Sequence, residues 1–311
     1  MELLCPTTWK DYELIDCGDF EKLERFGEYI TIRPEPQAIW NKKLPEREWE
    51  KLAHVRFVSK SSSQGDWKKL KQMPDQWKIK YKVKSETSQK SKEEGSEITF
   101  RLGLTSFKHV GVFPEQAVNW DYIYHSVAKM KTSSPLLGRG VGGEAVPRVL
   151  NLFAYTGGAS LAAKVAGADI THLDSIKQVV SWARENMELS NLDNIRWLVE
   201  DALTFVRREV KRGNKYNGII LDPPAFGHGP TGEKWKLEDN INEMMQHVLT
   251  LLDDEKHFLV LNAYSLGFSP LVIENMLRDK AKKNLQTGEV YIQSSNVNKL
   301  PLGVFGRFRN F

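Results

Sequence analysis

Four short hydrophobic segments in the middle of the chain each run into a glycine turn or an aspartate. They cover residues 149–152, 169–173, 195–199 and 216–221. A helix that opens on small residues follows the first segment, and a helical pattern over residues 177–189 follows the second. Strands that alternate with helices form a parallel sheet, whose carboxyl strand ends meet in a crevice that binds ligands. The pattern therefore predicts an α/β fold with its special residues gathered at one edge.

The last segment ends in the run Leu-Asp-Pro-Pro-Ala-Phe at residues 221–226. A residue that precedes proline is confined to extended geometry, so the strand end at Asp222 and Pro223 is stiff. The Asp222 carboxylate and the Pro223 carbonyl can accept hydrogen bonds from a planar amino group and aim its nitrogen lone pair at an electrophile. We therefore expect Asp222, Pro223 and Pro224 to form a catalytic group, with Phe226 stacked on the ring that carries the nitrogen. An ordinary strand that ends in a proline turn has the same sequence.

A glycine turn follows the first segment, at residues 153–158. Gly157 and Gly158 carry no side chain, so the backbone can approach a ligand closely. The helix that follows would point its free N–H groups at a carboxylate or phosphate. A glycine pair can also serve tight packing alone, and the full Gly-x-Gly-x-x-Gly fingerprint is absent. The candidate ligand-binding residues of the turn are Phe153, Ala154, Tyr155, Thr156, Gly157 and Gly158.

Two acids close the next two strands. Asp174 lies about twenty residues beyond the glycines, where a doubly wound sheet holds the ribose diol of a nucleotide. Asp201 is followed by the small residue Ala202 and could accept a hydrogen bond from an adenine amino group. Together with Ser175, these residues form the predicted nucleoside site. Either aspartate could instead cap the helix that follows it.

Residues 149–226 carry the glycine turn, the ribose acid, the adenine acid and the Asp-Pro-Pro-Ala-Phe string in this order. They resemble the class I S-adenosylmethionine-dependent methyltransferases that methylate nucleobase nitrogens. With Phe-Lys-His-Val-Gly-Val-Phe-Pro-Glu-Gln at residues 107–116, the region 95–311 resembles the bacterial large-subunit ribosomal RNA methyltransferase family. The resemblance implies a Rossmann-like seven-stranded sheet with one reversed strand and S-adenosyl-L-methionine as cofactor. It also implies that Gln116 borders the methionine end of the cofactor, although Gln116 could instead begin a helix.

The chain departs from this family at one position. Members that methylate a base carbon carry a nucleophilic cysteine after the fifth strand, whereas residues 259–265 of this chain read Leu-Val-Leu-Asn-Ala-Tyr-Ser, with Ala263 there. A pyrimidine carbon is methylated only after a thiolate has added to the ring, and Cys5 and Cys17 lie far away in sequence. A base nitrogen already carries a lone pair and needs only alignment and electrostatic support. We therefore expect methylation of an amino or ring nitrogen in RNA, and the resemblance points to ribosomal RNA.

Three other functions are compatible with the sequence. Asp-Pro-Pro tips also orient glutamine side chains, so the acceptor could be a protein amide or a small molecule. The chain could be a non-catalytic RNA-binding module that retains the fold, although the intact string at residues 222–226 argues against it. It could also be a nicotinamide oxidoreductase. Strand patterns at residues 288–293 and 303–308, without a helix between them, predict an antiparallel hairpin that such dehydrogenases usually lack.

Length and composition allow one substantial core with a smaller appended domain, because the chain has 311 residues and a hydrophobic content of 41%. We expect residues 1–105 to form a small β-rich N-terminal domain and residues 106–311 to form the methyltransferase domain. A helix over residues 115–131 would lead into the sheet. Residues 84–96 and 132–147 are polar or rich in Gly, Ser and Pro, which predicts loops.

The chain is basic between residues 60 and 84, which contain eight lysines and two aspartates. Residues 77–84 alternate between apolar residues and lysines, which predicts a strand with one buried face and one lysine face. The buried residues would be Trp77, Ile79, Tyr81 and Val83, and the exposed ones Lys78, Lys80, Lys82 and Lys84. This face could follow RNA phosphates, or its lysines could prevent pairing at a sheet edge. The formal net charge of +4 is compatible with a nucleic-acid partner.

Other features narrow the class of protein. No apolar run is long enough to span a bilayer, and the first residues are unlike a signal peptide, so we expect a cytoplasmic protein without a membrane partner. Two cysteines far from any histidine cluster predict neither a disulfide framework nor a metal site. Residues 227–236 contain two glycine-flanked turns and could form a lid over the substrate or an ordinary surface loop.

Overall fold

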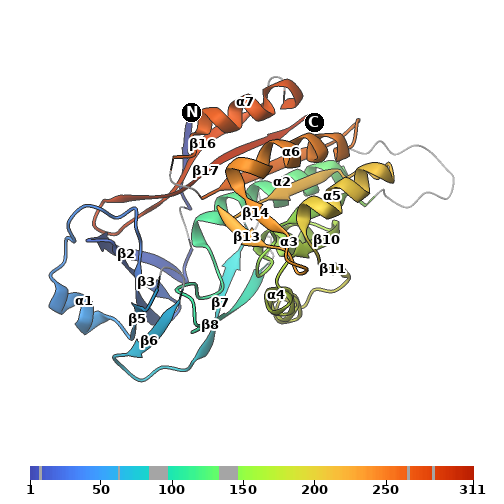
Figure 1. The fold of residues 1–311 in the computed structure, drawn as a ribbon. Coiled ribbons are helices and arrows are strands. Elements are labelled where there is room, and N and C mark those ends of the chain that lie inside the picture. The colour runs from blue at the N-terminus through green and yellow to red at the C-terminus, as the bar shows by residue number, and fades with distance from the viewer. Residues whose placement is uncertain (7–8, 62–63, 84–96, 133–145, 265–266, 282–283) are drawn as a thin grey trace.

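A computed structural model gives the fold of the chain and describes all residues except 7–8, 62–63, 84–96, 133–145, 265–266 and 282–283. A large sheet with helices on both faces lies beside a group of smaller β-sheets from the first third of the chain (Figure 1). The predicted loop over residues 84–96 and most of the predicted loop over residues 132–147 lie outside the described residues.

The helices and strands follow one another in two stretches. The first contains β1 (Glu2–Leu4), β2 (Tyr12–Gly18), β3 (Glu21–Phe26), β4 (Tyr29–Pro34), α1 (Glu46–Leu52), β5 (Val55–Ser59), β6 (Gly65–Lys69), β7 (Gln76–Lys82), β8 (Glu97–Gly103), the 3₁₀ turn η1 (Pro114–Gln116) and α2 (Ala117–Thr132). The second contains β9 (Arg148–Leu152), α3 (Gly158–Val165), β10 (Asp169–Asp174), α4 (Lys177–Leu189), β11 (Ile195–Val199), α5 (Ala202–Lys211), β12 (Gly218–Leu221), β13 (Phe226–His228), β14 (Lys234–Lys236), α6 (Leu237–Leu251), β15 (Phe258–Ala263), α7 (Pro270–Ala281), β16 (Gln286–Gln293) and β17 (Lys299–Arg309).

The large sheet has the strand order β1-β16-β17-β15-β12-β9-β10-β11. Its pairs are parallel except those made by β17, which is antiparallel to β15 and β16. The predicted α/β sheet with one reversed strand and a closing hairpin is therefore confirmed. The prediction of seven strands is corrected to eight, because β1 adds a strand beside β16. A Cβ on Gly288 would lie 1.8 Å from the Glu2 carbonyl oxygen, so this pairing depends on a glycine, and three residues are too few to show a strand period.

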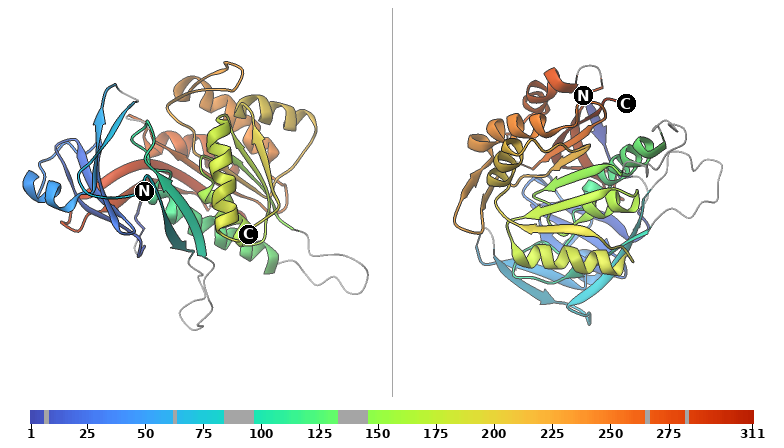
Figure 2. Two further views of the ribbon diagram at one scale, coloured as in Figure 1. Left: turned by 90° about the horizontal axis from the view of Figure 1, so that it is seen from below. Right: turned by 90° about the vertical axis from the view of Figure 1, so that its right-hand side faces the viewer.

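Residues of the strands alternate between two hydrophobic clusters, one on each face of the large sheet. Val149 packs in the cluster that contains Leu161 of α3, and the next residue, Leu150, packs in the cluster that contains Met244 of α6. Figure 2 shows the helices on both sides of the sheet. Because both faces are covered, the central strands appear in the sequence as continuous hydrophobic runs.

The N-terminal sheets are a five-stranded sheet in the order β2-β3-β4-β5-β6 and the hairpin of β7 and β8. The predicted alternation along β7 is confirmed for the described residues, with Trp77, Ile79, Tyr81 and Val83 buried and Lys78, Lys80 and Lys82 exposed. Lys84 lies outside the described residues. In the described part of the chain β7 pairs with no strand other than β8, so it is an edge strand.

One hydrophobic cluster joins the N-terminal sheets to the large sheet. The centroid of the Trp9 ring lies 4.9 Å from that of Tyr81 in β7 and 5.7 Å from that of Trp120 in α2. A side chain of α4 also accepts a hydrogen bond from the outer edge of β8. The backbone N–H of Arg101 in β8 donates to Oδ1 of Asn186 in α4 at 2.8 Å. These contacts fix the N-terminal sheets against the helices that surround the crevice.

Among the residues that the structure describes, no helix combines the length and the apolar character needed to cross a membrane. Within the same residues, no three or more His, Cys, Asp or Glu side chains are arranged to hold a metal ion. Cys5 and Cys17 are both free thiols.

A buried carboxylate holds the segment between β4 and α1. Asp16 of β2 is fully buried, and its Oδ2 accepts hydrogen bonds from the Lys43 and Leu44 N–H groups at 3.0 and 2.9 Å and from Trp49 Nε1 at 3.0 Å. Its Oδ1 accepts from the Cys17 N–H at 2.9 Å. Converging donors offset the cost of burying the charge.

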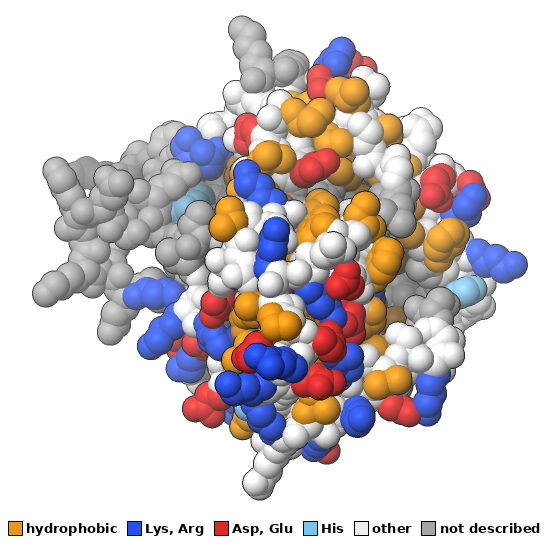
Figure 3. Space-filling view, turned by 90° about the vertical axis from the view of Figure 1, so that its left-hand side faces the viewer, with side chains coloured by type: hydrophobic (Ala, Val, Ile, Leu, Met, Phe, Trp, Pro, Cys, Tyr) orange, Lys and Arg blue, Asp and Glu red, His pale blue; other side chains and the backbone are white. Residues whose placement is uncertain are grey.

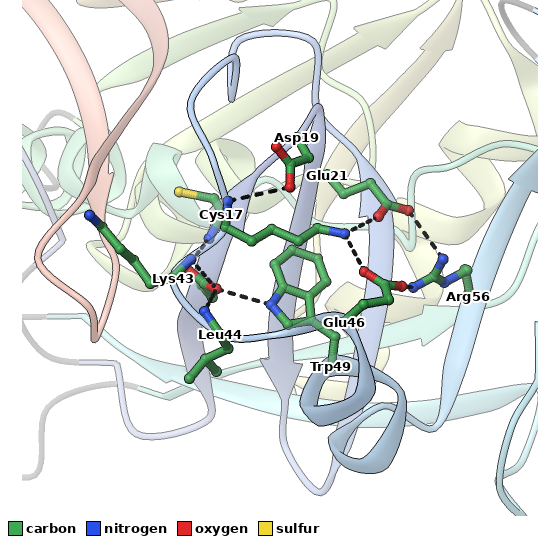
Figure 4. Close-up of polar contacts among 10 residues, drawn as sticks. Cys17, Asp19, Glu21, Lys43, Leu44, Glu46, Trp49 and Arg56 are labelled. Carbon is green, nitrogen blue, oxygen red and sulfur yellow. Dashed lines mark hydrogen bonds and ion pairs between the residues drawn. The ribbon is translucent and has the colours of Figure 1, made fainter.

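Charged side chains surround Trp49, as Figure 4 shows. The Lys42 ammonium lies 4.1 Å from the centroid of the Trp49 ring and donates to Glu21 at 2.6 Å and to Glu46 at 2.7 Å. Arg56 of β5 pairs with Glu46 from the other side. The network ties α1 to β3 and β5.

We expect Asp16→Asn to lower the free energy of unfolding by about 2 kcal/mol, because an amide NH2 would then face backbone N–H groups that have lost their acceptor. Asp19→Asn is the control, since Asp19 only accepts from the exposed Lys42 N–H at 3.5 Å and its change should stay below about 0.5 kcal/mol. Urea unfolding followed by tryptophan fluorescence measures both variants. Equal losses in the two variants would contradict the structural role of Asp16.

Candidate active site

Two adjoining hollows open at the carboxyl ends of β9, β10, β11 and β12. The first hollow is lined by the predicted residues Gln116, Phe153, Ala154, Tyr155, Thr156, Gly157, Gly158 and Asp222. The second hollow is lined by the predicted residues Phe153, Asp174, Ser175, Asp201, Ala202 and Pro224. Because Phe153 lines both, the structure brings these residues to one crevice. Of the predicted site residues, Pro223 and Phe226 line neither hollow.

The glycine turn between β9 and α3 has a strained backbone. Phe153 and Tyr155 have φ angles of 55° and 49°, and Gly157 has a φ of 93°, all in the left-handed region. The Tyr155 N–H donates to Asp174 Oδ2 at 2.9 Å, which ties the turn to the end of β10. Strained backbone of this kind clusters at ligand-binding sites.

The two glycines serve different purposes. Gly157 adopts a backbone conformation that side chains other than glycine rarely take. A Cβ on Gly158 would lie 2.5 Å from the Trp120 ring, so the tight-packing interpretation holds for Gly158. Both residues also line the first hollow.

Asp174 holds the backbone that follows it while lining the second hollow. Its Oδ1 accepts from the Ile176 N–H at 3.0 Å, and its Oδ2 accepts from Tyr155. Burial raises the pKa of this carboxyl, and the hydrogen bonds from the backbone lower it in part. Each carboxylate oxygen can accept a further hydrogen bond from a ligand.

Asp201 is the N-cap of α5, because its Oδ1 accepts from the Thr204 N–H at 2.7 Å. The helix-cap alternative is therefore confirmed for this residue. Asp201 also lines the second hollow beside Ala202. One oxygen fixes the helix, so the other can face a ligand.

Asp222 follows β12 and lines the first hollow. The register of β12 and β15 pairs Leu221 with Leu261, so Asp222 and Asn262 are the next neighbours, and Asn262 Nδ2 donates to Asp222 Oδ1 at 2.9 Å. Burial raises the pKa of the Asp222 carboxyl to about 6, and the hydrogen bond from Asn262 acts to lower it. Asn262 was not among the predicted site residues. Its signal in the sequence is a polar side chain at the end of an otherwise apolar strand.

A second acid near Asp222 was also missed. Glu115 of η1 is buried, and burial raises the pKa of its carboxyl to about 7. The nearby Asp222 raises this pKa further, whereas Lys22 of β3 lowers it. Sequence reasoning could not find the acid, because its surroundings come from β3 and β12, which are far from η1 in the chain.

Phe226, which was predicted to stack on the ring of the acceptor, lies outside both hollows. Phe226 begins β13, its side chain is 68% exposed, and it pairs with Lys236 of β14. The proline pair carries the chain away from the first hollow before the aromatic residue is reached. The stacking role of Phe226 stays a prediction.

Trp235 attaches the β13–β14 hairpin to the segment that follows β12. Its ring centroid lies 4.8 Å from that of Phe153, and its Nε1 donates to the Pro224 carbonyl at 2.7 Å. With Gly227 and His228, Trp235 lines the second hollow. Residues 227–236, for which the sequence left a lid or a surface loop open, therefore border the hollow that contains Asp174 and do not line the hollow that contains Asp222.

The segment before α2 closes the first hollow from the other side. Thr156 Oγ1 donates to the Gly111 carbonyl at 2.7 Å, and the Phe113 ring centroid lies 5.0 Å from that of Tyr155. Gln116 ends η1 directly before α2 and also lines the first hollow. The alternative that Gln116 begins a helix agrees with this position, and its contact with the methionine end of the cofactor stays a prediction.

The chain is similar to known methyltransferases in sequence and structure. A family model described as S-adenosylmethionine-dependent methyltransferase matches residues 136–279. The chain is also similar to the protein in the crystal structure of the SAM-dependent methyltransferase from Agrobacterium tumefaciens. The two sequences are 33% identical, and the structural match covers 99% of this chain and 93% of that chain with a TM-score of 0.83.

Two curated relatives carry the name ribosomal RNA large subunit methyltransferase K/L. The protein from Shewanella frigidimarina (strain NCIMB 400) is 28% identical over 167 residues, which is 52% of this chain and 21% of the relative. The protein from Pseudoalteromonas atlantica (strain T6c / ATCC BAA-1087) is 26% identical over 222 residues, which is 66% of this chain and 27% of the relative. The chain thus matches about a quarter of the length of these relatives.

We expect Trp235→Ala to weaken the binding of S-adenosylmethionine about tenfold, because the wall of the second hollow loses its attachment to Phe153 and Pro224. Lys234→Ala is the control, since Lys234 is an exposed residue of the same strand and should leave the affinity unchanged. Isothermal titration calorimetry measures both. An unchanged affinity in a folded Trp235→Ala protein would show that the hairpin does not shape the site.

Proposed function

The chain belongs to the S-adenosylmethionine-dependent methyltransferase family, and we propose that it methylates a nitrogen of a nucleobase in ribosomal RNA. The Asp222 carboxyl carries this proposal, because it lines the first hollow beside the glycine turn and directly precedes two prolines. Among the described residues, no cysteine lines either hollow. The site therefore offers an acceptor for N–H groups and no thiol to attack a base carbon.

The residues of the crevice fit S-adenosyl-L-methionine, the cofactor of this family. We infer that Asp174 and Ser175 bind the ribose hydroxyls and that Asp201 and Ala202 border the adenine, since these residues line the second hollow. The glycine turn and Gln116, which line the first hollow, would border the methionine end. The donors and acceptors of the two hollows suit these groups, because carboxylates accept from hydroxyl and amino groups.

Asp222 would orient the acceptor by accepting a hydrogen bond from one N–H of the acceptor's amino group. This bond would turn the nitrogen lone pair toward the methyl carbon. The cofactor supplies a methyl group on a cationic sulfur: the new N–C bond forms as the C–S bond breaks, and the electron pair of that bond stays on sulfur. The nitrogen must then lose one proton. Because the pKa of Asp222 is about 6, its carboxyl is ionised at neutral pH and can take up this proton before passing it to water.

Ribosomal RNA is the proposed acceptor because the two curated relatives are named for it. The net charge of +4 and the lysine face of β7 agree with a polyanionic partner. A protein amide or a small molecule is the competing acceptor, since an aspartate before two prolines can orient any planar amide or amine.

We expect Asp222→Ala to reduce methyl transfer to ribosomal RNA at least about a hundredfold while leaving the affinity for S-adenosylmethionine nearly unchanged. The assay uses methyl-labelled cofactor and RNA from cells that lack the gene. Nuclease digestion and mass spectrometry then identify the methylated nucleoside. Label that survives RNase and is lost on protease treatment would overturn the RNA proposal, and full turnover by Asp222→Ala would exclude this carboxyl from the chemistry.

The division into residues 1–105 and 106–311 is also part of this proposal, except that β1 pairs with β16 in the large sheet, and the first unit is proposed to bind RNA. Lys78 and Lys82 lie on the exposed face of β7, and no described carboxylate pairs with either. The face around α1 differs, because its basic residues lie among acidic ones in Figure 3, as in the pairs Lys42–Glu21 and Arg56–Glu46. The β7 face is therefore the better candidate for contact with phosphates.

We expect Lys78→Glu combined with Lys82→Glu to weaken RNA binding and to reduce the slope of log affinity against log salt by about 1.5, because two phosphate contacts are lost. Arg47→Glu combined with Lys51→Glu on α1 is the control with the same charge change. Filter binding over a salt series measures the slope. Equal effects of the two pairs would show that the β7 face has no special role.

A further inference from the structure

Asn262 is the penultimate residue of β15, and its side chain is buried beside Asp222. The residue is 2% exposed and lines the first hollow. Its Nδ2 donates to Asp222 Oδ1 at 2.9 Å, whereas its Oδ1 has no hydrogen-bond partner among the described residues. A carboxylate only accepts hydrogen bonds, so the amide must turn its NH2 group toward Asp222 and leave its oxygen unpaired.

Fold stability does not account for an asparagine at this position. An unpaired buried carbonyl oxygen costs free energy, and an apolar side chain of similar size would avoid that cost. Gly303 of the neighbouring strand lies against the amide, where a Cβ would meet Asn262 Nδ2 at 3.5 Å, an ordinary van der Waals distance. The surroundings thus accommodate a polar group whose one partner is the proposed catalytic carboxyl.

We propose that Asn262 is the positioning residue of this site: its amide fixes Oδ1 of Asp222 and leaves Oδ2 to accept the N–H of the incoming amino group. No described residue donates to Oδ2. The proposal deepens the proposed function and depends on it for the role of Asp222 in methyl transfer. The hydrogen bond itself can be tested without the acceptor.

The hydrogen bond also affects the charge of Asp222. It favours the ionised carboxyl and so opposes the effect of burial on the pKa of Asp222. Glu115 of η1 interacts with Asp222, and Tyr155 of the glycine turn lines the same hollow. Glu115 in turn interacts with Lys22 and Glu24 of β3 and with Tyr264 beyond β15. These groups are unchanged in variants of Asn262, so a change in the titration of Asp222 in such variants reports on the amide.

The test is an NMR titration of the Asp222 carboxyl in protein labelled with ¹³C-aspartate. The resonance of Asp222 is identified as the one that is missing from the spectrum of the Asp222→Asn variant. In the wild type we expect a midpoint near pH 6, in line with the pKa of about 6 for Asp222. Asn262→Ala should move the midpoint up by about one pH unit, because the donor is lost. Asn262→Asp keeps the size of the side chain and adds a like charge, so the upper midpoint of the coupled pair should move further.

Asn217→Ala is the matched control. Asn217 directly precedes β12, at the opposite end from Asp222, and its Nδ2 donates to the Lys256 carbonyl at 3.1 Å. This variant should leave the Asp222 midpoint unchanged. An unchanged midpoint in both Asn262 variants would overturn the positioning role.

Kinetics separate this proposal from the proposed function. With ribosomal RNA as acceptor, the acid limb of the pH–rate profile should shift upward in the order wild type, Asn262→Ala, Asn262→Asp, while the affinity for S-adenosylmethionine stays constant. If the NMR midpoints shift and no RNA is methylated by the wild type, the positioning contact stands and the proposed function fails. If RNA is methylated and the acid limb does not move, the positioning role fails and the proposed function stands.

Discussion

The position of β12 in the middle of the large sheet determines where Asp222, the proposed catalytic carboxyl, lies. β12 pairs in parallel with β9 and β15, and the register aligns Leu221 with Leu152 on one side and Leu261 on the other. β9 and β12 end at this level, whereas β15 continues to Ala263, so the glycine turn and Asp222 come to lie beside Asn262 at one edge of the sheet. Two prolines then keep the chain extended beyond Asp222, so its carboxyl stays at this edge.

Burial raises the pKa values of the carboxyl groups at this edge of the sheet. Hydrophobic clusters cover both faces of the sheet, and desolvation is the leading cause of the raised pKa values of Asp222, Asp174 and Glu115. A positively charged ligand in the crevice would lower all three pKa values, whereas an anion would raise them. The three carboxyl groups of the crevice therefore suit the cationic sulfur of S-adenosylmethionine in charge.

The sequence predicted those parts of the fold that depend on local pattern. β10 at Asp169–Asp174 and α4 at Lys177–Leu189 occur where hydrophobic runs and helical spacing placed them. Most of the predicted site residues line the crevice, because the glycine turn, Asp174 and Asp222 lie at the carboxyl ends of parallel strands, whereas lining residues such as Trp120 and Asn262 were not predicted. The eighth strand was missed, since a three-residue strand has no period and its pairing depends on Gly288, far away in the chain.

The positions of Asn262 and Trp235 were not predicted either, because they also depend on contacts between segments that are distant in the chain. Asn262 acquires its place only through the register between β12 and β15, which no single segment encodes. For residues 227–236 the sequence left a lid or a surface loop open, and the packing of Trp235 on Phe153 places this segment at the second hollow. Long-range contacts of this kind decide which side of a loop faces the site, whereas local pattern decides only that a loop is present.

The central claim is that the Asp222 carboxyl stands beside the reacting methyl group. A crystal structure with bound S-adenosylhomocysteine tests it most directly. The account predicts the sulfur in the first hollow near Asp222, with the adenosine in the second hollow against Asp174 and Asp201. A sulfur atom remote from Asp222, or an adenosine bound outside the second hollow, would contradict the account.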